Sequence, residues 1–181
     1  HSWIRDKVND EMATWVPRLP ISIVIPLYNR KEMLGRTLAA LTHQTYPLEL
    51  LQIVIADDGS DDHPEEVFTT FEGRFEIVHV RQNDLGYRLS KVRNLGIRAA
   101  KNDHIILLDC DMAPVPRFVE TYSRHLDVTE RAVFCGHRRY IDANSIPFNE
   151  LESSISPLLS LPDIETANIQ VKGQQTGPTV D

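Results

Sequence analysis

The amino-acid sequence predicts an α/β fold: an open, mainly parallel β-sheet flanked by helices. Strand-like apolar runs alternate with helix-like segments along the chain, which is the order of a parallel sheet with crossover helices. The runs are apolar almost throughout rather than at every second residue, which indicates strands covered on both faces. At 181 residues the chain is long enough for one domain with a substantial core.

Composition excludes some classes of protein. An apolar fraction of 41% and a charged fraction of 25% are those of an ordinary globular protein. A net charge of −7 leaves no basic surplus to neutralise phosphates, so nucleic acid is not an expected partner. No apolar run reaches the ~20 residues that cross a bilayer. We therefore expect no transmembrane segment in this chain and a cytoplasmic location, with peripheral attachment to the inner face of the membrane left open.

Residues 1–20 are predicted to contain an amphipathic helix without a chemical motif. Apolar side chains recur at a spacing of three to four residues, and Pro17 ends the pattern. The apolar face consists of Ile4, Val8, Met12 and Trp15 or Val16. We expect this face to pack on the domain or on a neighbouring domain of a longer protein.

Two pairs of a strand and a helix follow. Each strand is a β-rich apolar run closed by a proline or by turn formers, and each helix carries apolar residues at helical spacing. The predicted strands are residues 21–25 and 51–56; the first helix carries Leu34, Leu38 and Leu41, and the second, opened by Pro64, carries Val67 and Phe71.

The alternation continues to Ile141, after which the apolar pattern decays. Strands are predicted at residues 75–80, 104–108 and 131–136. Ser90 is a candidate cap for the helix between the first two of these strands. The two predicted helices are residues 90–101, with Val92, Leu95 and Ala99 on the inner face, and residues 118–126.

Polar clusters follow four of the predicted strands. They comprise residues 26–30, 57–61, 84–88 and 109–111. In open α/β sheets, ligands bind beyond the carboxyl ends of the strands, and these ends share one edge. A random scatter of turns would occupy both edges, so the clusters together indicate one binding site.

Asp109 and Asp111 are the candidate metal ligands of that site. Their spacing in extended backbone puts both carboxylates on one face, where like charges repel unless a cation compensates. Mg²⁺ and Mn²⁺ typically take one or two protein carboxylates and complete their shell with diphosphate oxygens and water. Taken alone, the pair could also be a solvated turn after a strand.

The remaining clusters supply the other parts of a nucleoside diphosphate site. Tyr28 offers a flat face for a base, Asp58 can accept a hydrogen bond from a base N–H, and Arg88 and Arg93 could neutralise phosphate. Each has an alternative. Tyr28 could merely cover the sheet edge, residues 57–60 could form only a turn and helix cap, and Arg93 could be solvated.

Three further side chains are not expected to be metal ligands. Cys110 and Cys135 lie in or beside apolar runs, which indicates reduced, buried thiols rather than a disulfide framework. Thiolates also seldom bind Mg²⁺ or Mn²⁺. Arg81 is expected to pair with a surface acid.

Four short motifs occur in order along the chain. They are VIPLYNR at residues 24–30, IADDGS at 55–60, RNLG at 93–96 and LDCD at 108–111. In this order and with these separations they resemble the GT-A glycosyltransferases of family 2, over about residues 20–145. Within the family, residues 109–114 and 138–142 are most similar to bacterial chondroitin polymerase-type enzymes.

The resemblance implies a Rossmann-like GT-A sheet and an inverting transferase that uses a UDP-sugar donor, a Mn²⁺ or Mg²⁺ ion and a saccharide acceptor in polysaccharide or glycan synthesis. Residues 21–145 would form the donor-binding subdomain, and residues 146–181 the start of an acceptor-side segment. Matched by position, the nucleotide-binding residues are Pro26, Tyr28, Asn29, Arg30, Asp57, Asp58, Arg88, Arg93, Asp109 and Cys110, and the metal ligands are Asp111 and Asp109.

The sequence departs from the family pattern in one respect. Inversion needs a carboxylate base to deprotonate the attacking hydroxyl, but no Glu-Asp pair of the family's kind follows Asp142. The base, the acceptor-binding segment and a later metal-binding His are therefore expected beyond residue 181. We expect the chain to be the donor-binding half, which binds UDP with metal but transfers sugar poorly or not at all.

Two other functions stay as alternatives. A sugar-nucleotide nucleotidyltransferase also uses an α/β sheet, Mg²⁺ and paired acids. It would be expected to carry a Gly-rich phosphate loop, and residues 26–32 are not Gly-rich. A catalytically inactive nucleotide-binding or scaffold domain would keep the fold without metal-dependent affinity. Hexose discrimination depends on pocket shape, so the motifs leave the donor sugar and the acceptor open.

Overall fold

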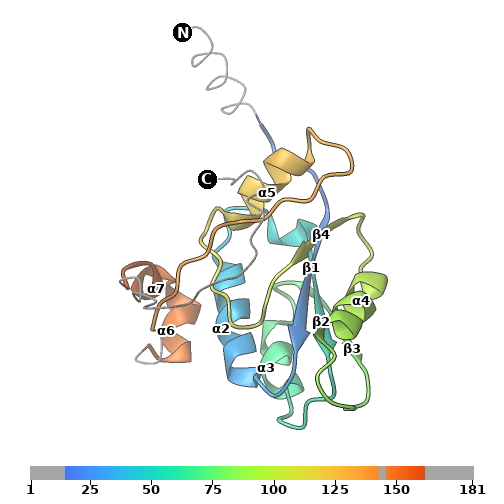
Figure 1. Ribbon diagram of the computed structural model, residues 1–181. Helices are drawn as coiled ribbons and strands as arrows, with labels where there is room; N and C mark the ends of the chain where they lie inside the picture. The colour runs from blue at the N-terminus through green and yellow to red at the C-terminus, as the bar shows by residue number, and fades with distance from the viewer. Residues whose placement is uncertain (1–14, 143–145, 162–181) are drawn as a thin grey trace, which may run out of the picture.

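A four-stranded parallel sheet lies at the centre of the computed structural model, which describes residues 15–142 and 146–161 (Figure 1). The strands are β1 (Ile21–Leu27), β2 (Leu51–Asp57), β3 (Glu76–Arg81) and β4 (His104–Leu107), in the order β3-β2-β1-β4. All three pairings are parallel. The predicted α/β fold with a parallel sheet is therefore confirmed.

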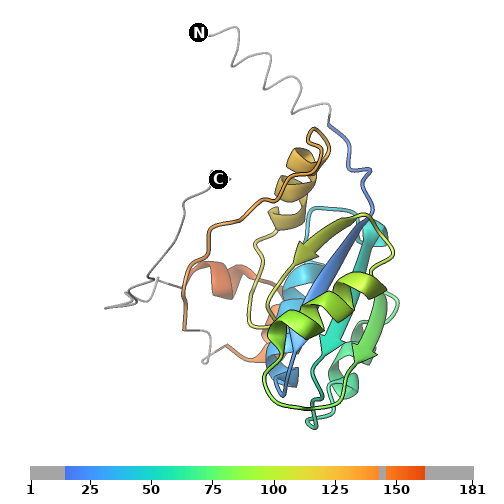
Figure 2. The same ribbon diagram turned by 45° about the vertical axis from the view of Figure 1, so that its right-hand side comes forward.

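Helices cover both faces of this sheet. Figures 1 and 2 show α4 on one face and α2 with α3 on the other, while α6 lies beside α2 and α5 lies near the end where β1 begins. The helices are α2 (Lys31–Thr42), α3 (Glu65–Phe68), α4 (Leu89–Ala99), α5 (Phe118–Leu126), α6 (Phe148–Ser153) and α7 (Ser156–Leu159), with short 3₁₀ turns at Leu48–Leu50 and Thr69–Phe71.

The two central strands, β1 and β2, are buried along their whole length. One side of β1, including Ile23 and Ile25, packs with Leu34 and Leu38 of α2. The opposite side packs through Val24 against Val92 of α4. This double coverage is the physical reason for the continuous apolar pattern, because both faces of each central strand exclude water. The edge strands β3 and β4 are more exposed than the prediction allowed.

The predicted strand at residues 131–136 is wrong. The segment belongs to no strand of the described sheet, and the side chain of Val133 is 91% exposed. Cys135, expected to be buried, is exposed and free, whereas Cys110 is free and buried as expected. The β-rich composition misled the prediction because β-propensity mainly reflects packing against paired strands, and none of the described strands of the sheet pairs with this segment.

Two smaller expectations also fail. Helix α4 begins at Leu89, before Ser90, and its N-cap residue Arg88 makes no side-chain capping bond. The apolar pattern does not end at Ile141, since α6 and α7 follow and bring Leu151 and Leu158 into the core. These helices are too short to show a clear helical period.

The predicted N-terminal helix falls mainly on residues 1–14, which lie outside the described residues. Residues 15–20 have no regular secondary structure, although Trp15 packs against the core near Tyr46. None of the helices in the described ranges has the length and apolarity needed to span a bilayer.

Gly96 allows α4 to lie close to the sheet. A Cβ atom added at Gly96 would lie 2.4 Å from Cγ1 of Val24 and 3.0 Å from Cβ of Ala56. Val24 and Ala56 are fully buried, and valine is stiff at χ1, so neither can move aside at little cost. The close contact holds α4 against β1 and β2.

Replacement of Gly96 by Ala is expected to lower the free energy of unfolding by about 1–3 kcal/mol through overpacking. This would occur even though helix propensity alone favours Ala over Gly by about 1 kcal/mol. Urea denaturation followed by circular dichroism measures the change. Asn94→Ala, on the exposed side of α4, is the matched control and should stay within about 0.5 kcal/mol of wild type. A Gly96→Ala chain as stable as wild type would contradict the close-contact explanation.

Candidate functional site

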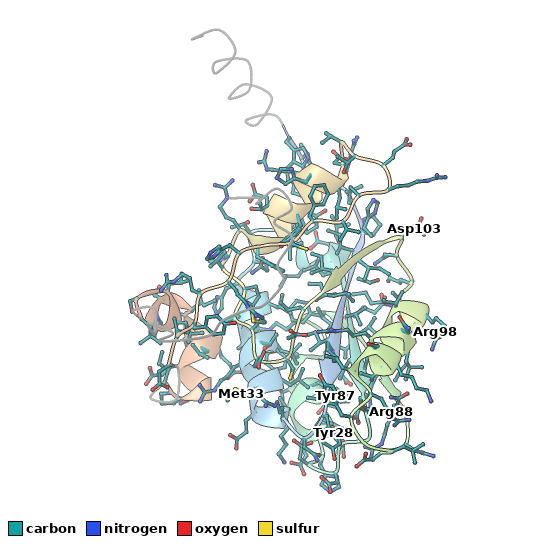
Figure 3. All side chains as sticks on the ribbon, in the orientation of Figure 1. Tyr28, Met33, Tyr87, Arg88, Arg98 and Asp103 are labelled. Atoms are coloured by element: carbon teal, nitrogen blue, oxygen red, sulfur yellow. The ribbon has the colours of Figure 1, made fainter. Side chains whose placement is uncertain are left out.

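A cavity of about 420 Å³ opens at the carboxyl edge of the sheet. Figure 3 shows Tyr28, Tyr87 and Arg88 together at this end of the molecule, with Arg98 and Asp103 well away from it. The lining comes from the end of β1, the segments that follow β1, β2 and β4, the loop before α4 and the start of α4: Pro26, Leu27, Tyr28, Arg30, Asp58, Gly86, Tyr87, Leu89, Val92, Asp109, Cys110 and Asp111. All four polar clusters therefore meet at one edge.

Most of the candidate site residues from the sequence line this cavity. The exceptions are Asn29, Asp57, Arg88 and Arg93, which hydrogen-bond to lining residues or to the loops that carry them. Of the other lining residues, Leu27, Gly86 and Tyr87 lie within the predicted polar clusters but were assigned no role, and Leu89 and Val92 were not predicted to line the site. The one available signal was the aromatic ring of Tyr87 in a glycine-containing loop, since the apolar lining residues carry no chemical signature.

Asp58 anchors the loop between β3 and α4. Its Oδ1 accepts hydrogen bonds from Nε2 of Gln82 at 2.5 Å and from the guanidinium of Arg88 at 3.0 Å. Its Oδ2 accepts the backbone N–H of Arg88 at 3.1 Å. A carboxylate oxygen has two acceptor positions, so Oδ2 keeps one for a ligand.

Asp57, the last residue of β2, is fully buried and organises the turn that carries Asp58. Its Oδ1 accepts the backbone N–H groups of Gly59 at 3.1 Å and Ser60 at 2.7 Å. Its Oδ2 lies 3.2 Å from the guanidinium of Arg81 and 3.4 Å from Nε2 of His79. Asp57 thus shapes the site without facing the cavity.

The charge of Asp57 is stabilised in this buried position. Burial by itself raises the pKa of Asp57, but hydrogen bonds from His79 and Ser60 and the charge of Arg81 outweigh burial and hold that pKa below its usual value. Arg81 therefore pairs with a buried acid, not with the surface acid that the sequence suggested. The parallel register explains the pairing, because Asp57 lies opposite Arg81 across β2 and β3.

Three loops pack together around Tyr28 and Gly59. The hydroxyl of Tyr28 donates to Oδ2 of Asp84 at 2.9 Å, and this hydrogen bond, with the charge of Asp84, raises the pKa of Tyr28. Gly59 has φ +94°, and a Cβ atom there would lie 2.4 Å from the backbone nitrogen of Asp84. The backbone N–H of Asn29 donates to Oγ of Ser60 at 2.9 Å. The three loops therefore form one rigid wall.

The acidic pair after β4, Asp109 and Asp111, is partly exposed, and each carboxylate forms an ion pair with a different arginine. Asp109 pairs with Arg93 at 2.5 Å, and Asp111 pairs with Arg30 at 3.6 Å. Thr37 on α2 fixes the backbone here, since its hydroxyl lies 2.8 Å from the carbonyl oxygen of Cys110. Burial raises the pKa of the Cys110 thiol to about 11, so this residue does not offer a thiolate.

The two carboxylates fit Mg²⁺ or Mn²⁺. The side chains of Asp109 and Asp111 are 45% and 51% exposed, so their oxygens are within reach of solvent and ligand. Two such carboxylates are a usual protein contribution when substrate phosphates and water complete the shell. Within the described ranges, no group of three or more His, Cys, Asp or Glu side chains gathers as a metal cage.

Comparison with known proteins agrees with this architecture. A sequence model described as "Glycosyl transferase family 2" matches residues 22–177. The chain belongs to glycosyl transferase family 2. Among its family 2 relatives, the chondroitin synthase of Escherichia coli is 43% identical over 85% of this chain and 22% of that protein. The hyaluronan synthase of Pasteurella multocida is 38% identical over 86% of this chain and 16% of that protein.

These comparisons confirm the resemblance to chondroitin polymerase-type enzymes and show that this family 2 chain spans about a fifth of the length of those relatives. Solved structures identify the fold as GT-A. S. aureus TarS in complex with UDP-GlcNAc has a TM-score of 0.63 at 18% identity, covering 71% of this chain and 37% of that one. The mannosyltransferase PcManGT of Pyrobaculum calidifontis, in complex with GDP-Man and Mn²⁺, has a TM-score of 0.55 at 14% identity, covering 82% and 45%.

Asp57→Asn is expected to lower the free energy of unfolding at pH 7 by about 2 kcal/mol, because hydrogen bonds to charged groups contribute ~1.5–3 kcal/mol. The lowered pKa of Asp57 means that its charge stabilises the fold above the unfolded-state pKa of about 4 and that this stabilisation is lost as the pH falls through the folded-state value. The difference between wild type and variant should therefore shrink below about pH 4. Urea denaturation at a series of pH values measures it; a difference that is constant with pH would contradict the charged role.

Proposed function

We propose that this chain binds a UDP-sugar together with a divalent cation and forms the donor-binding part of an inverting glycosyltransferase that elongates a saccharide. The observation that supports this proposal best is one cavity lined by a flat aromatic ring, Tyr28, an anchored carboxylate, Asp58, and an accessible acidic pair, Asp109 and Asp111. The family supports a glycosyl transfer reaction. A structure of the same fold holds UDP-GlcNAc, and another holds Mn²⁺ with GDP-Man.

In this proposal each polar or aromatic lining residue contacts a different part of the donor. Tyr28 stacks on the base, and the remaining acceptor position of Asp58 Oδ2 takes a base N–H, which favours a uracil edge. Asp111 holds the cation and Asp109 lies nearer the ribose. A bound cation would stabilise the negative charge that develops on the departing diphosphate.

The catalytic base is proposed to come from outside the described residues. Inversion requires a carboxylate that can accept the proton of the acceptor hydroxyl. The carboxylates that line the cavity, Asp58, Asp109 and Asp111, each already pair with an arginine. Because arginines already engage all three carboxylates, we assign them to donor binding and expect the chain alone to transfer sugar poorly or not at all.

The length of the relatives suggests that this chain works together with other domains. The chain covers only 22% of a chondroitin synthase and 16% of a hyaluronan synthase. We therefore propose that neighbouring domains supply the acceptor site, and that polysaccharide or glycan synthesis is the process served.

Calorimetric titration of UDP, UDP-sugars and UTP, with and without Mn²⁺, tests the proposal. UDP and UDP-sugars should bind in a Mn²⁺-dependent manner, and Asp111→Asn should weaken this binding at least about tenfold because a metal ligand is lost. Asp103→Asn is the matched control, since Asp103 lies away from the cavity (Figure 3).

If the affinity for UDP changes neither with Mn²⁺ nor with the Asp111 substitution, the transferase proposal is contradicted and a catalytically inactive nucleotide-binding domain is favoured. A clear preference for UTP over UDP-sugars would favour a nucleotidyltransferase instead.

A further inference from the structure

The acids that line the cavity are balanced by arginines in this structure. Asp58 pairs with Arg88 at 3.0 Å, Asp109 with Arg93 at 2.5 Å and Asp111 with Arg30 at 3.6 Å. The local charge is therefore close to zero, although the chain as a whole carries −7. A diphosphate entering this cavity would gain little from arginines that already hold carboxylates.

The three pairs differ in strength. Arg88 and Asp58 are mostly buried, and three hydrogen bonds anchor this carboxylate. Arg93 hydrogen-bonds directly to Asp109, with side chains 32% and 45% exposed. Arg30 and Asp111 are 57% and 51% exposed, and their 3.6 Å separation exceeds hydrogen-bonding distance. The Arg30 pair is therefore the weakest of the three and the easiest to exchange.

Arg30 is also the arginine best placed to meet a ligand. It lines the cavity, whereas Arg88 and Arg93 are not among the lining residues. It is the N-cap residue of α2 and makes no side-chain capping bond, so its guanidinium can turn without weakening the helix. A guanidinium recognises phosphate through parallel N–H groups, and this interaction is stronger than an exposed ion pair to a carboxylate.

We propose that Arg30 is an exchangeable counter-ion: it neutralises Asp111 while no metal is bound and turns to the diphosphate of the donor when a divalent cation takes its place on Asp111. This inference rests on the proposed function, because it assumes that the same cavity holds the diphosphate and the cation. It makes the two binding events mutually dependent. The cation releases Arg30 for the diphosphate, and by linkage the diphosphate favours the cation equally.

Two measurements on the intact chain test this exchange. Electron paramagnetic resonance of free Mn²⁺ reports metal binding without nucleotide, and calorimetry reports UDP binding at saturating Mn²⁺. Arg30→Gln should bind Mn²⁺ alone about two- to fivefold more tightly, because the competing cation is gone. The same variant should bind UDP with Mn²⁺ about tenfold more weakly, because a charge-assisted contact to phosphate is lost.

Two variants serve as controls. Arg98→Gln removes the same charge from the exposed side of α4, far from the cavity in Figure 3, and should match wild type in both measurements. Arg30→Lys keeps the charge, so its affinity for Mn²⁺ alone should stay within about twofold of wild type. Thermal unfolding shows whether Arg30→Gln is folded as wild type is.

The outcomes separate the exchange from the proposed function. If wild type binds UDP with Mn²⁺ but Arg30→Gln behaves like Arg98→Gln in either measurement, the exchange is overturned and the proposed function stands. If Arg30→Lys tightens Mn²⁺ binding as Arg30→Gln does, the exchange is overturned as well. If wild type binds no UDP with or without Mn²⁺, the proposed function fails and the exchange fails with it.

Discussion

Parallel pairing of β1 with β2 on one side and β4 on the other is the constraint on which the site depends. Leu27 lies opposite Asp57, and the backbone N–H of Leu108 donates to the carbonyl oxygen of Val24. The chain therefore leaves these strands at one edge of the sheet. Since β1 and β2 are buried throughout, a shifted register would disrupt the core as well as the site.

The buried carboxylate of Asp57 fixes the turn that follows β2, and this turn carries a residue that lines the cavity. Removing Asp57 from water costs several kcal/mol unless its oxygens are paired, and this structure pairs both of them. The compensation comes from the turn that follows β2 and from Arg81 on β3, so satisfying the buried charge also fixes the conformation of residues 57–60. With Asp57 buried and its turn fixed, the next residue, Asp58, lines the cavity.

The charge balance at the cavity differs from the net charge of the whole chain. The whole chain is acidic, which would repel an anionic donor at long range. At the cavity, Arg30 before α2 and two arginines of α4 and its N-cap, Arg88 and Arg93, balance the acids that line it. In the proposed function, an anionic donor would bind by rearranging existing pairs together with a cation, without a basic surface. The membership of family 2 and the GT-A fold are consistent with such a chemistry.

The sequence by itself determined the parallel α/β fold, the family and the edge at which the cavity opens. Those features follow from continuous apolar strands and from motifs at strand ends, which are local patterns. Only the tertiary structure decided that Arg81 pairs with buried Asp57, that Tyr87 lines the cavity and that residues 131–136 join no described strand. These features depend on register across strands, on loop packing and on the presence of a neighbouring strand, which are contacts between residues far apart in the chain and leave no periodic signal in it.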